Sequence, residues 1–214
     1  MKLLTEISAS LQAGDDARVA ELTGQAIDAG IGAADILADG LIAGMDVIGE
    51  QFRSHEIFLP DVLLAARAMH AGMDLLKPLF VEEEVPRLGK VVLGTVQGDI
   101  HDIGKNLVGI MVEGAGFEVI DLGKDVAPEA FVDAAVAANA QVIGMSTLLT
   151  TTVPAMLQVV EILEERGLGD SIRTIAGGAP VTRDLVQQIG ADAYGYDAAN
   201  AVEILKELTG VSSS

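Results

Sequence analysis

Residues 90–106 read KVVLGTVQGDIHDIGKN and decide the fold of the second half of this 214-residue chain. A short apolar run at 91–93 passes into a polar loop that begins near Gly98, and helical spacing follows from about residue 105. A strand, a polar loop and a helix in this order are typical of a parallel β–α unit. The same succession then recurs to the end of the chain.

The recurrence predicts an α/β sheet. Further strands are expected at 117–120, 142–145, 172–175 and, more weakly, 191–194, and helices at 105–115, 128–139, 153–167, 182–189 and 198–208. Alternating strands and helices predict a parallel sheet that is covered on both faces. Five such units indicate a doubly wound sheet of flavodoxin-like type. Such sheets bind ligands where the strand order reverses, here between the first and third strands.

Before this sheet, residues 1–77 read as helices. Apolar residues recur at helical spacing, a third helix is expected from Ala33 to Phe52, and Pro60 suits the first turn of a fourth. Short connections between such helices predict an antiparallel bundle of about four. Residues 78–89, which contain two prolines and three consecutive glutamates, are expected to be a linker. The expected division is therefore a helical domain at 1–77, a linker at 78–89 and an α/β domain at 90–214.

Composition narrows the classes of function. A formal net charge of −19 repels phosphate backbones, which argues against a nucleic-acid partner. The absence of cysteine from the sequence excludes disulfides and thiolate metal sites. The sequence has no apolar run that could span a bilayer and no targeting leader at its start, so no membrane association and a cytoplasmic location are expected.

The loop after the first expected strand carries the chemistry. It contains one imidazole, His101, with the carboxylate of Asp99 two residues before it. A metal-bound histidine usually donates its second ring N–H to a carboxylate. Because no second histidine or cysteine lies nearby, a metal here would arrive inside a macrocycle, which leaves haem or a corrinoid. The alternative is an ordinary loop histidine held by an aspartate, with Asp102 capping the following helix.

Three stretches of the second half resemble motifs of cobalamin-binding domains in which a protein histidine replaces the cofactor's own base under cobalt. They are Asp99-x-His101-x-x-Gly104, Ser146-Thr147-Leu148 and Gly177-Gly178. In the first half, residues 48–52 and 57–60 are similar to the helix–loop–helix junction of the cap in methyl-carrying corrinoid proteins. The chain thus resembles those proteins, and the cobalamin-binding module of methionine synthase, over nearly its whole length.

The resemblance implies roles for particular residues. His101 would bind cobalt from below, oriented by Asp99. A hydroxyl behind Asp99 would fall at Thr152, where the better-known relatives have serine, and Thr150 and Thr151 are alternatives for this hydroxyl. The nucleotide tail of the cofactor would enter a slot between sheet and helices that small residues line, with Gly109, Gly144, Gly177 and Gly178 as candidates. The cofactor-binding residues expected in this way are Asp99, His101, Gly104, Ser146, Leu148, Thr150, Thr152, Gly177, Gly178, Phe52, Leu59 and Val62. The last three match apolar cap positions over the upper face, and His101 is the expected metal ligand.

The function implied is that of a non-catalytic methyl carrier, which holds cobalamin as methylcobalamin or cob(I)alamin. Its partners would be a substrate-specific methyltransferase and an acceptor methyltransferase, with a reductive activase as a further candidate. Two alternatives stay open: the cobalamin-binding subunit of an adenosylcobalamin-dependent isomerase, and a cobalamin sensor. The helical cap argues against the isomerase, and the lack of an effector module in this acidic sequence argues against the sensor.

Overall fold

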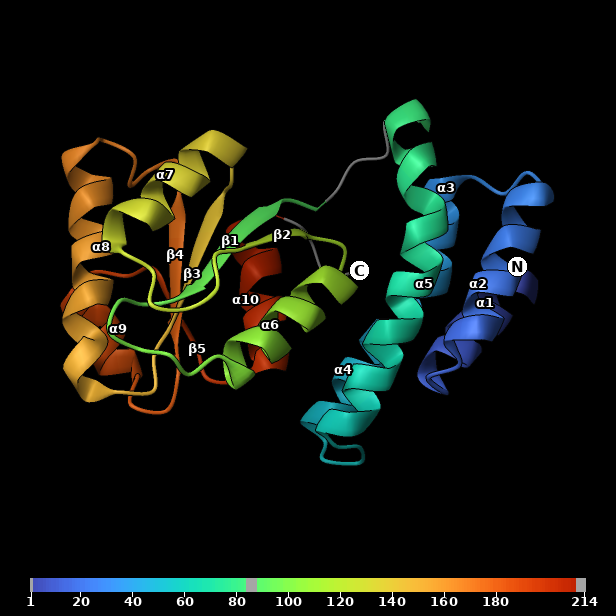
Figure 1. Ribbon diagram of the computed structural model, residues 1–214, viewed down its shortest axis with the longest axis horizontal. Helices are drawn as coiled ribbons and strands as arrows, with labels where there is room; N and C mark the ends of the chain where they lie inside the picture. Colours follow the sequence, from blue (N-terminus) through green and yellow to red (C-terminus); the bar gives the residue numbers. More distant parts are fainter. Residues whose placement is uncertain (1, 84–87, 211–214) are drawn as a thin grey trace. The chain divides into compact units, whose positions relative to one another are not determined.

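The computed structural model describes residues 2–83 and 88–210. The chain divides into two compact units, one with residues 1–87 and 114–116 and the other with residues 88–113 and 117–214. The first unit is helical, and the second is a parallel sheet with helices on both faces (Figure 1). Within the described ranges, no helix is both long enough and apolar enough to cross a membrane.

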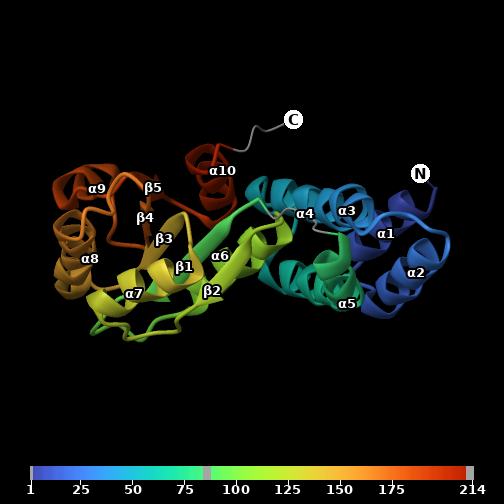
Figure 2. The ribbon, with the colours of Figure 1, turned by 90° about the horizontal axis from the view of Figure 1, so that it is seen from above.

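The helical unit is built from long amphipathic segments. Its elements are α1 (Lys2–Gln12), α2 (Asp16–Asp28), α3 (Ala33–Asp35), the π-helix η1 (Ile36–Ile42), α4 (Ala43–Arg53) and α5 (Leu59–Glu83). The Asp15 side chain caps α2 by accepting a hydrogen bond from the Arg18 N–H. Helix α5 packs against α2 and α4 (Figures 1 and 2). Because α3, η1 and α4 follow one another without a break, residues 2–83 form the bundle of four helical segments that the periodicity predicts.

One expectation for this unit is wrong. The linker was expected to begin at Pro78, but α5 continues through this proline to Glu83. A proline removes a single backbone donor, so a helix can pass through it, often with a bend, where the flanking residues favour helix. Residues 84–87 of the expected linker lie outside the described residues.

The second unit is a five-stranded parallel sheet in the order β2-β1-β3-β4-β5. The strands are β1 (Lys90–Thr95), β2 (Glu118–Asp121), β3 (Val142–Ser146), β4 (Arg173–Gly177) and β5 (Ala193–Gly195). This is the flavodoxin-like order expected from the sequence. From β1, the chain adds β2 on one side and β3, β4 and β5 on the other. The loops that follow β1 and β3 therefore lie at the topological switch point of the sheet.

Helices cover the two faces of the sheet unequally. On one face lie α7 (Pro128–Ala138), α8 (Val153–Glu165) and α9 (Arg183–Ile189), and on the other lie α6 (Ile103–Gly114) and α10 (Ala198–Leu208) (Figure 1). The first face holds an apolar core that includes Val92, Phe131, Ile143, Met145 and Val159. Burial of these side chains is the main source of stability for the sheet.

The face towards α6 and α10 is different, because its last layer contains small side chains. Strand register pairs Thr95 with Ser146, Ser146 with Gly177, and Gly177 with Gly195. These four residues, called here the small-residue row, alternate with the core residues on the other face. The row thus lies at the carboxyl ends of four neighbouring strands and places only small residues on this face of the sheet.

Candidate functional site

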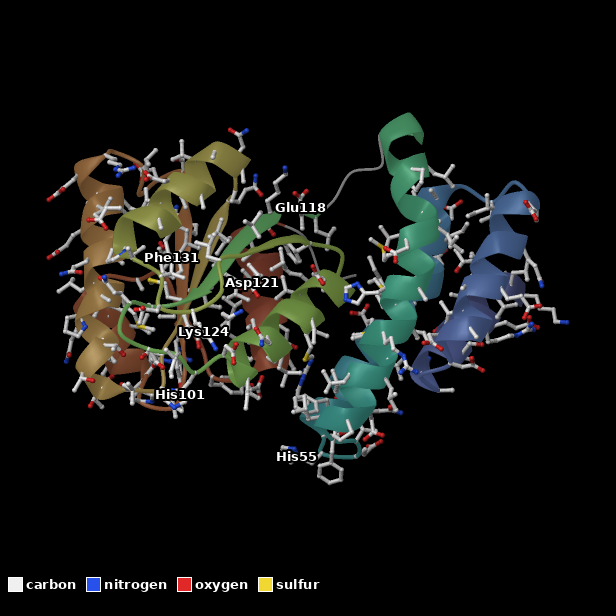
Figure 3. The ribbon with its side chains drawn as sticks, in the orientation of Figure 1. His55, His101, Glu118, Asp121, Lys124 and Phe131 are labelled. Atoms are coloured by element: carbon white, nitrogen blue, oxygen red, sulfur yellow. The ribbon has the colours of Figure 1, made fainter. Side chains whose placement is uncertain are left out.

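His101 lies in the loop between β1 and α6, at the carboxyl end of the sheet. Figure 3 shows it at the end of this unit opposite to Glu118, where β2 begins. Half of its side chain is exposed, and its Nδ1 atom lies 2.7 Å from Asp99 Oδ1. Among the described residues, Nε2 has no hydrogen-bond partner. The half-exposed ring therefore keeps Nε2 without a partner among the described residues, as a metal ligand requires.

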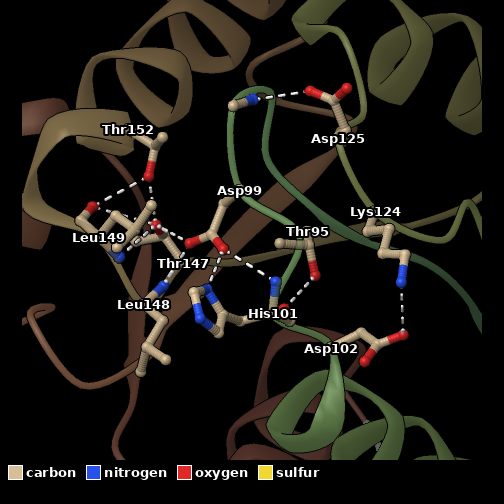
Figure 4. A network of polar contacts seen from close by, with 11 residues as sticks. Thr95, Asp99, His101, Asp102, Lys124, Asp125, Thr147, Leu148, Leu149 and Thr152 are labelled. Atoms are coloured by element: carbon tan, nitrogen blue, oxygen red, sulfur yellow. Dashed lines mark hydrogen bonds and ion pairs between the residues drawn. The ribbon is translucent and has the colours of Figure 1, made fainter.

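Asp99 is fully buried and receives hydrogen bonds on both carboxylate oxygens (Figure 4). Oδ1 accepts from the backbone N–H and from Nδ1 of His101, at 2.9 and 2.7 Å. Oδ2 accepts from the Thr147 hydroxyl at 2.9 Å and from the Leu148 N–H at 2.6 Å. Oδ1 thus accepts hydrogen bonds from the histidine loop, and Oδ2 accepts hydrogen bonds from the loop after β3.

These donors control the charge of Asp99. Burial by itself raises the pKa of the carboxyl group. The N–H groups of His101 and Leu148, followed by the imidazole and the Thr147 hydroxyl, lower it by more, so that the pKa lies well below its usual range. Asp99 is consequently ionised at neutral pH and can accept a proton-bearing Nδ1, which leaves the Nε2 lone pair available for a metal.

This pKa shift predicts a pH-dependent stability. Asp99→Asn is expected to destabilise the cofactor-free protein by about 2 kcal/mol near pH 7, because buried donors lose a charged acceptor. Since the folded-state pKa is lowered, the contribution is complete above the unfolded pKa of about 3.9 and is lost as the pH falls below it. Urea unfolding of both proteins near pH 7, 5 and 3.5 measures the difference. Asp102→Asn, whose carboxylate makes one 3.9 Å contact with Lys124, is the control, and an equal loss in both variants would contradict the expectation.

The hydroxyl behind Asp99 belongs to Thr147, so its expected assignment to Thr152 is corrected. Thr152 is buried one step further away: its Oγ1 lies 2.6 Å from Thr147 Oγ1 and donates to the Leu149 carbonyl at 2.9 Å. Thr147 directly follows β3, next to β1 in the sheet, whereas the 3-10 turn η2 (Thr150–Thr152) folds back behind it. Thr147 stands inside the recognised tripeptide, so its adjacency to the strand end was the signal for its role.

Two further polar contacts fix the histidine loop and the helix that follows it. The Thr95 hydroxyl donates to the His101 carbonyl at 2.9 Å. Lys105, whose side chain is only 1% exposed, donates to both Asp121 oxygens, at 2.7 and 2.6 Å, and so ties α6 to the end of β2. Nothing in the sequence marks Lys105 as a buried residue, because lysine is ordinarily exposed and its partner lies sixteen residues away.

The other expected residues of this unit surround the same end of the sheet. Ser146 and Gly177 belong to the small-residue row, Leu148 and Thr150 are exposed, and Gly104 has open space where a side chain would start. Gly178 has φ 125°, and a Cβ atom there would lie 1.8 Å from the Thr147 carbonyl oxygen. Only glycine therefore fits at 178, where the loops after β3 and β4 approach each other.

Gly109 and Gly144, expected to line a slot, both pack on Leu93. A Cβ atom at Gly144 would lie 2.8 Å from Leu93 Cδ1, and one at Gly109 would lie 3.4 Å from Leu93 Cδ2. These two glycines accommodate a leucine side chain in the present arrangement.

In the helical unit, the expected cap residues differ in exposure. Phe52, near the end of α4, and Leu59, at the start of α5, are half-buried, whereas Val62 is fully buried. The loop between α4 and α5 carries Phe58, which is 68% exposed, and His55, which is exposed and has φ 62°. Phe52 and Leu59 therefore have accessible apolar surface, and their contact with a cofactor stays a prediction.

Large apolar side chains are exposed around His101. Between 38% and 75% of the surface of each residue is exposed. Together these residues are called the apolar rim. Its members are Ile100, Ile103, Leu148, Leu149 and Tyr196. They follow β1, β3 and β5, so they gather at the carboxyl end of the sheet. Clustered exposed apolar side chains commonly mark a binding surface.

Comparison with known proteins assigns the family. Residues 89–205, more than half of the chain, match the family model described as the B12 binding domain. The chain belongs to the B12-binding corrinoid proteins. Residues 3–77 match a second model that is also described as a B12 binding domain. Corrinoid proteins bind cobalamin, and cobalt enters the site within its corrin ring.

Similar corrinoid proteins extend over almost the whole chain. A corrinoid protein of Desulfitobacterium hafniense (strain Y51) is 41% identical over 98% of this chain and 99% of its own length. Trimethylamine corrinoid protein 1 of Methanosarcina acetivorans is 45% identical over 88% of each chain. Among solved structures, the methanol:cobalamin methyltransferase complex MtaBC of Methanosarcina barkeri contains a chain with a TM-score of 0.88 and 32% identity, covering 99% of this chain and 81% of that one.

The described residues of this corrinoid protein suit a corrinoid. An imidazole nitrogen without a described partner suits a metal that needs one axial ligand, and the apolar rim suits a broad macrocycle. The small-residue row suits a tail that passes the carboxyl end of the sheet. Haem, left open by the residues alone, is not needed to explain the site.

Proposed function

We propose that this corrinoid protein is a methyl carrier, which accepts a methyl group from a substrate-specific methyltransferase and delivers it to a second methyltransferase. The observation that carries the proposal is the half-exposed His101 ring, with no described partner on Nε2, oriented by a buried, ionised Asp99 at the switch point of the sheet. The relatives named as trimethylamine and dimethylamine corrinoid proteins support it. Their names make methylated amines the first donors to test.

The residues divide the work of holding the cofactor. His101 would be the lower ligand, the apolar rim with Gly104 and Thr150 would receive the corrin, and Ser146 and Gly177 would border the nucleotide tail. Cobalamin supplies the chemistry, because its cobalt can accept a methyl group and give it up. Residues 90–214 would be the cobalamin-binding domain, and the helical unit, whose last helix continues past Pro78 to Glu83, would be the cap.

Asp99 would govern both states of the imidazole. With a proton on Nδ1 donated to Oδ1, the Nε2 lone pair points outward as a ligand. When Nε2 carries no ligand, the 2.7 Å contact between Nδ1 and Oδ1 still holds the ring in place. Thr147 and Leu148 keep that carboxylate charged and fixed in both cases.

Two methyltransferases are the proposed partners. The chain is similar to one in a methanol:cobalamin methyltransferase complex, which supports docking to a donor enzyme of comparable kind. An acceptor methyltransferase and a reductive activase complete the proposed system. The carrier itself would not select the methyl donor.

Methyl transfer in a defined mixture tests the proposal. The cobalamin-loaded chain, reduced with titanium(III) citrate, is mixed with trimethylamine-, dimethylamine- or methanol-specific methyltransferase and its donor, and methylation is followed by absorption. One donor system is expected to methylate the bound cofactor about a hundredfold faster than free cobalamin at equal concentration. Methyl iodide provides a chemical control. Bound cofactor that even methyl iodide cannot methylate would contradict a carrier role.

A further inference from the structure

We infer that Asp125, in the loop between β2 and α7, is a positioning residue for His101. It acts through the adjacent residues Gly98 and Asp99, whose backbone it holds from the side opposite to Thr147. The inference rests on the proposed role of His101 as the lower ligand of cobalt. Asp125 lies outside the three motifs by which the family resemblance is recognised, and its contacts give it a place in the same network (Figure 4).

Two opposed hydrogen bonds join Asp125 to the histidine loop. Its Oδ1 atom accepts from the Gly98 N–H at 2.8 Å, and its own N–H donates to the Asp99 carbonyl at 3.0 Å. Because Gly98 and Asp99 are consecutive residues, the two hydrogen bonds fix both the position and the orientation of their backbone. The segment carries the Cα atom of Asp99, from which the orienting carboxylate projects.

The backbone of Asp125 supports a special role. Its φ is 56°, in the left-handed region, and His55 and Asn139 are the other non-glycine residues in that region among those described. Asn139 is the C-cap of α7, a position where this conformation is routine. Asp125 caps no described helix, and its conformation brings its N–H and carboxylate to the same loop. An unfavourable backbone conformation persists where surrounding bonds determine it, and such sites are often functional.

The loop that carries Asp125 is itself anchored to β1. Thr95 N–H donates to the Gly123 carbonyl at 2.9 Å, and Val126 N–H donates to the Thr95 carbonyl at 3.0 Å. Asp125 therefore lies between Gly123 and Val126, which are both hydrogen-bonded to β1. Asp99 is held at its backbone by Asp125 and at its carboxylate by the loop after β3, and it passes that position to the imidazole through a 2.7 Å contact.

Three variants separate the side-chain bond from the backbone conformation. Asp125→Gly favours the left-handed backbone and removes the acceptor for Gly98. Asp125→Asn keeps a side-chain oxygen in the same position and also tolerates this backbone, but it is neutral. Asn139→Gly makes the same kind of backbone change at the end of α7 and is the matched control.

The measurement is the electron paramagnetic resonance spectrum of the cob(II)alamin-loaded protein at one neutral pH. The splitting by a histidine nitrogen reports the ratio of bound to released His101. Asp125→Gly is expected to lower this ratio about tenfold, as loss of an orienting partner of a metal ligand typically does. Asp125→Asn and Asn139→Gly should stay within about twofold of the unmodified chain. An unchanged ratio in Asp125→Gly, or equal shifts in Asp125→Gly and Asp125→Asn, would overturn the inference.

A second measurement needs no cofactor and covers the case in which Asp125→Gly loads poorly. Amide hydrogen exchange at Gly98 should be about tenfold faster in Asp125→Gly than in Asp125→Asn, because the bond to Oδ1 is lost. Equal exchange in the two variants would overturn the inference. If the unmodified protein shows no histidine splitting, the proposed ligand role of His101 fails. If it does, and the variants behave alike, only the role of Asp125 fails.

Discussion

Replacing His101 with alanine is expected to abolish the protein-derived nitrogen ligand of cobalt in the reconstituted protein. His101 is the histidine whose free Nε2 lies at the carboxyl end of the sheet, next to the apolar rim. A single axial nitrogen splits each line of the cob(II)alamin spectrum into a triplet, which becomes a doublet when that nitrogen is nitrogen-15. Protein labelled with nitrogen-15 in its histidines should give doublets, whereas labelled His101→Ala protein should give no splitting from a labelled nitrogen.

The chain provides its own controls, because it contains three histidines in all. His55→Ala and His70→Ala remove the other two and should leave the doublets unchanged. Doublets that survive in His101→Ala would mean that another histidine binds the metal. Triplets in the labelled unmodified protein would mean that the cofactor's own base stays on cobalt, and the proposed lower ligand would then be wrong.

Replacing Ser146 with leucine is expected to discriminate between two corrinoids. Ser146 belongs to the small-residue row, between Thr95 and Gly177, on the face covered by α6 and α10. A leucine side chain would occupy the room that a nucleotide tail needs, and overfilled sites bind poorly. Cobalamin carries this tail, and cobinamide has the same corrin without it. Binding of cobalamin should weaken by about a hundredfold or more, and binding of cobinamide by less than about threefold.

Equilibrium titration of each corrinoid, followed by absorption, measures both affinities. Ser146→Ala keeps the site small and should bind both corrinoids almost as the unmodified chain does. Equal weakening of both by Ser146→Leu would indicate damage to the corrin surface. Unchanged cobalamin binding would show that the tail does not pass the small-residue row.

The sequence was sufficient for the architecture of the sheet. Short apolar runs that alternate with helical segments left few arrangements open, and the observed strand order is the expected one. The helical unit was less predictable at its end, because Pro78 was taken as a stop although α5 continues to Glu83. A proline removes one backbone N–H donor, and whether the helix ends there depends on the flanking residues.

The site was predictable where the chemistry is local. Asp99 and His101 are two residues apart, so their pairing follows from the motif. The hydroxyl behind Asp99 was expected at Thr152, with Thr150 and Thr151 left open, and it belongs to Thr147. Residue spacing does not reveal that η2 turns Thr152 behind Thr147. The bond between Gly98 and Asp125 spans twenty-seven residues and depends on a left-handed backbone that no periodicity indicates. Contacts of this kind depend on how the loops fold, and the sequence pattern does not indicate them.

The division of labour between the two oxygens of Asp99 has a consequence for engineering. Grafting the residue 98–104 loop alone onto a foreign α/β scaffold would transplant an imidazole without its orientation, since Oδ2 would find no donor. A graft that also includes Thr147 and Leu148 would carry the paired donors with it. A graft that keeps the orientation of the imidazole therefore needs at least two loops, which follow neighbouring strands.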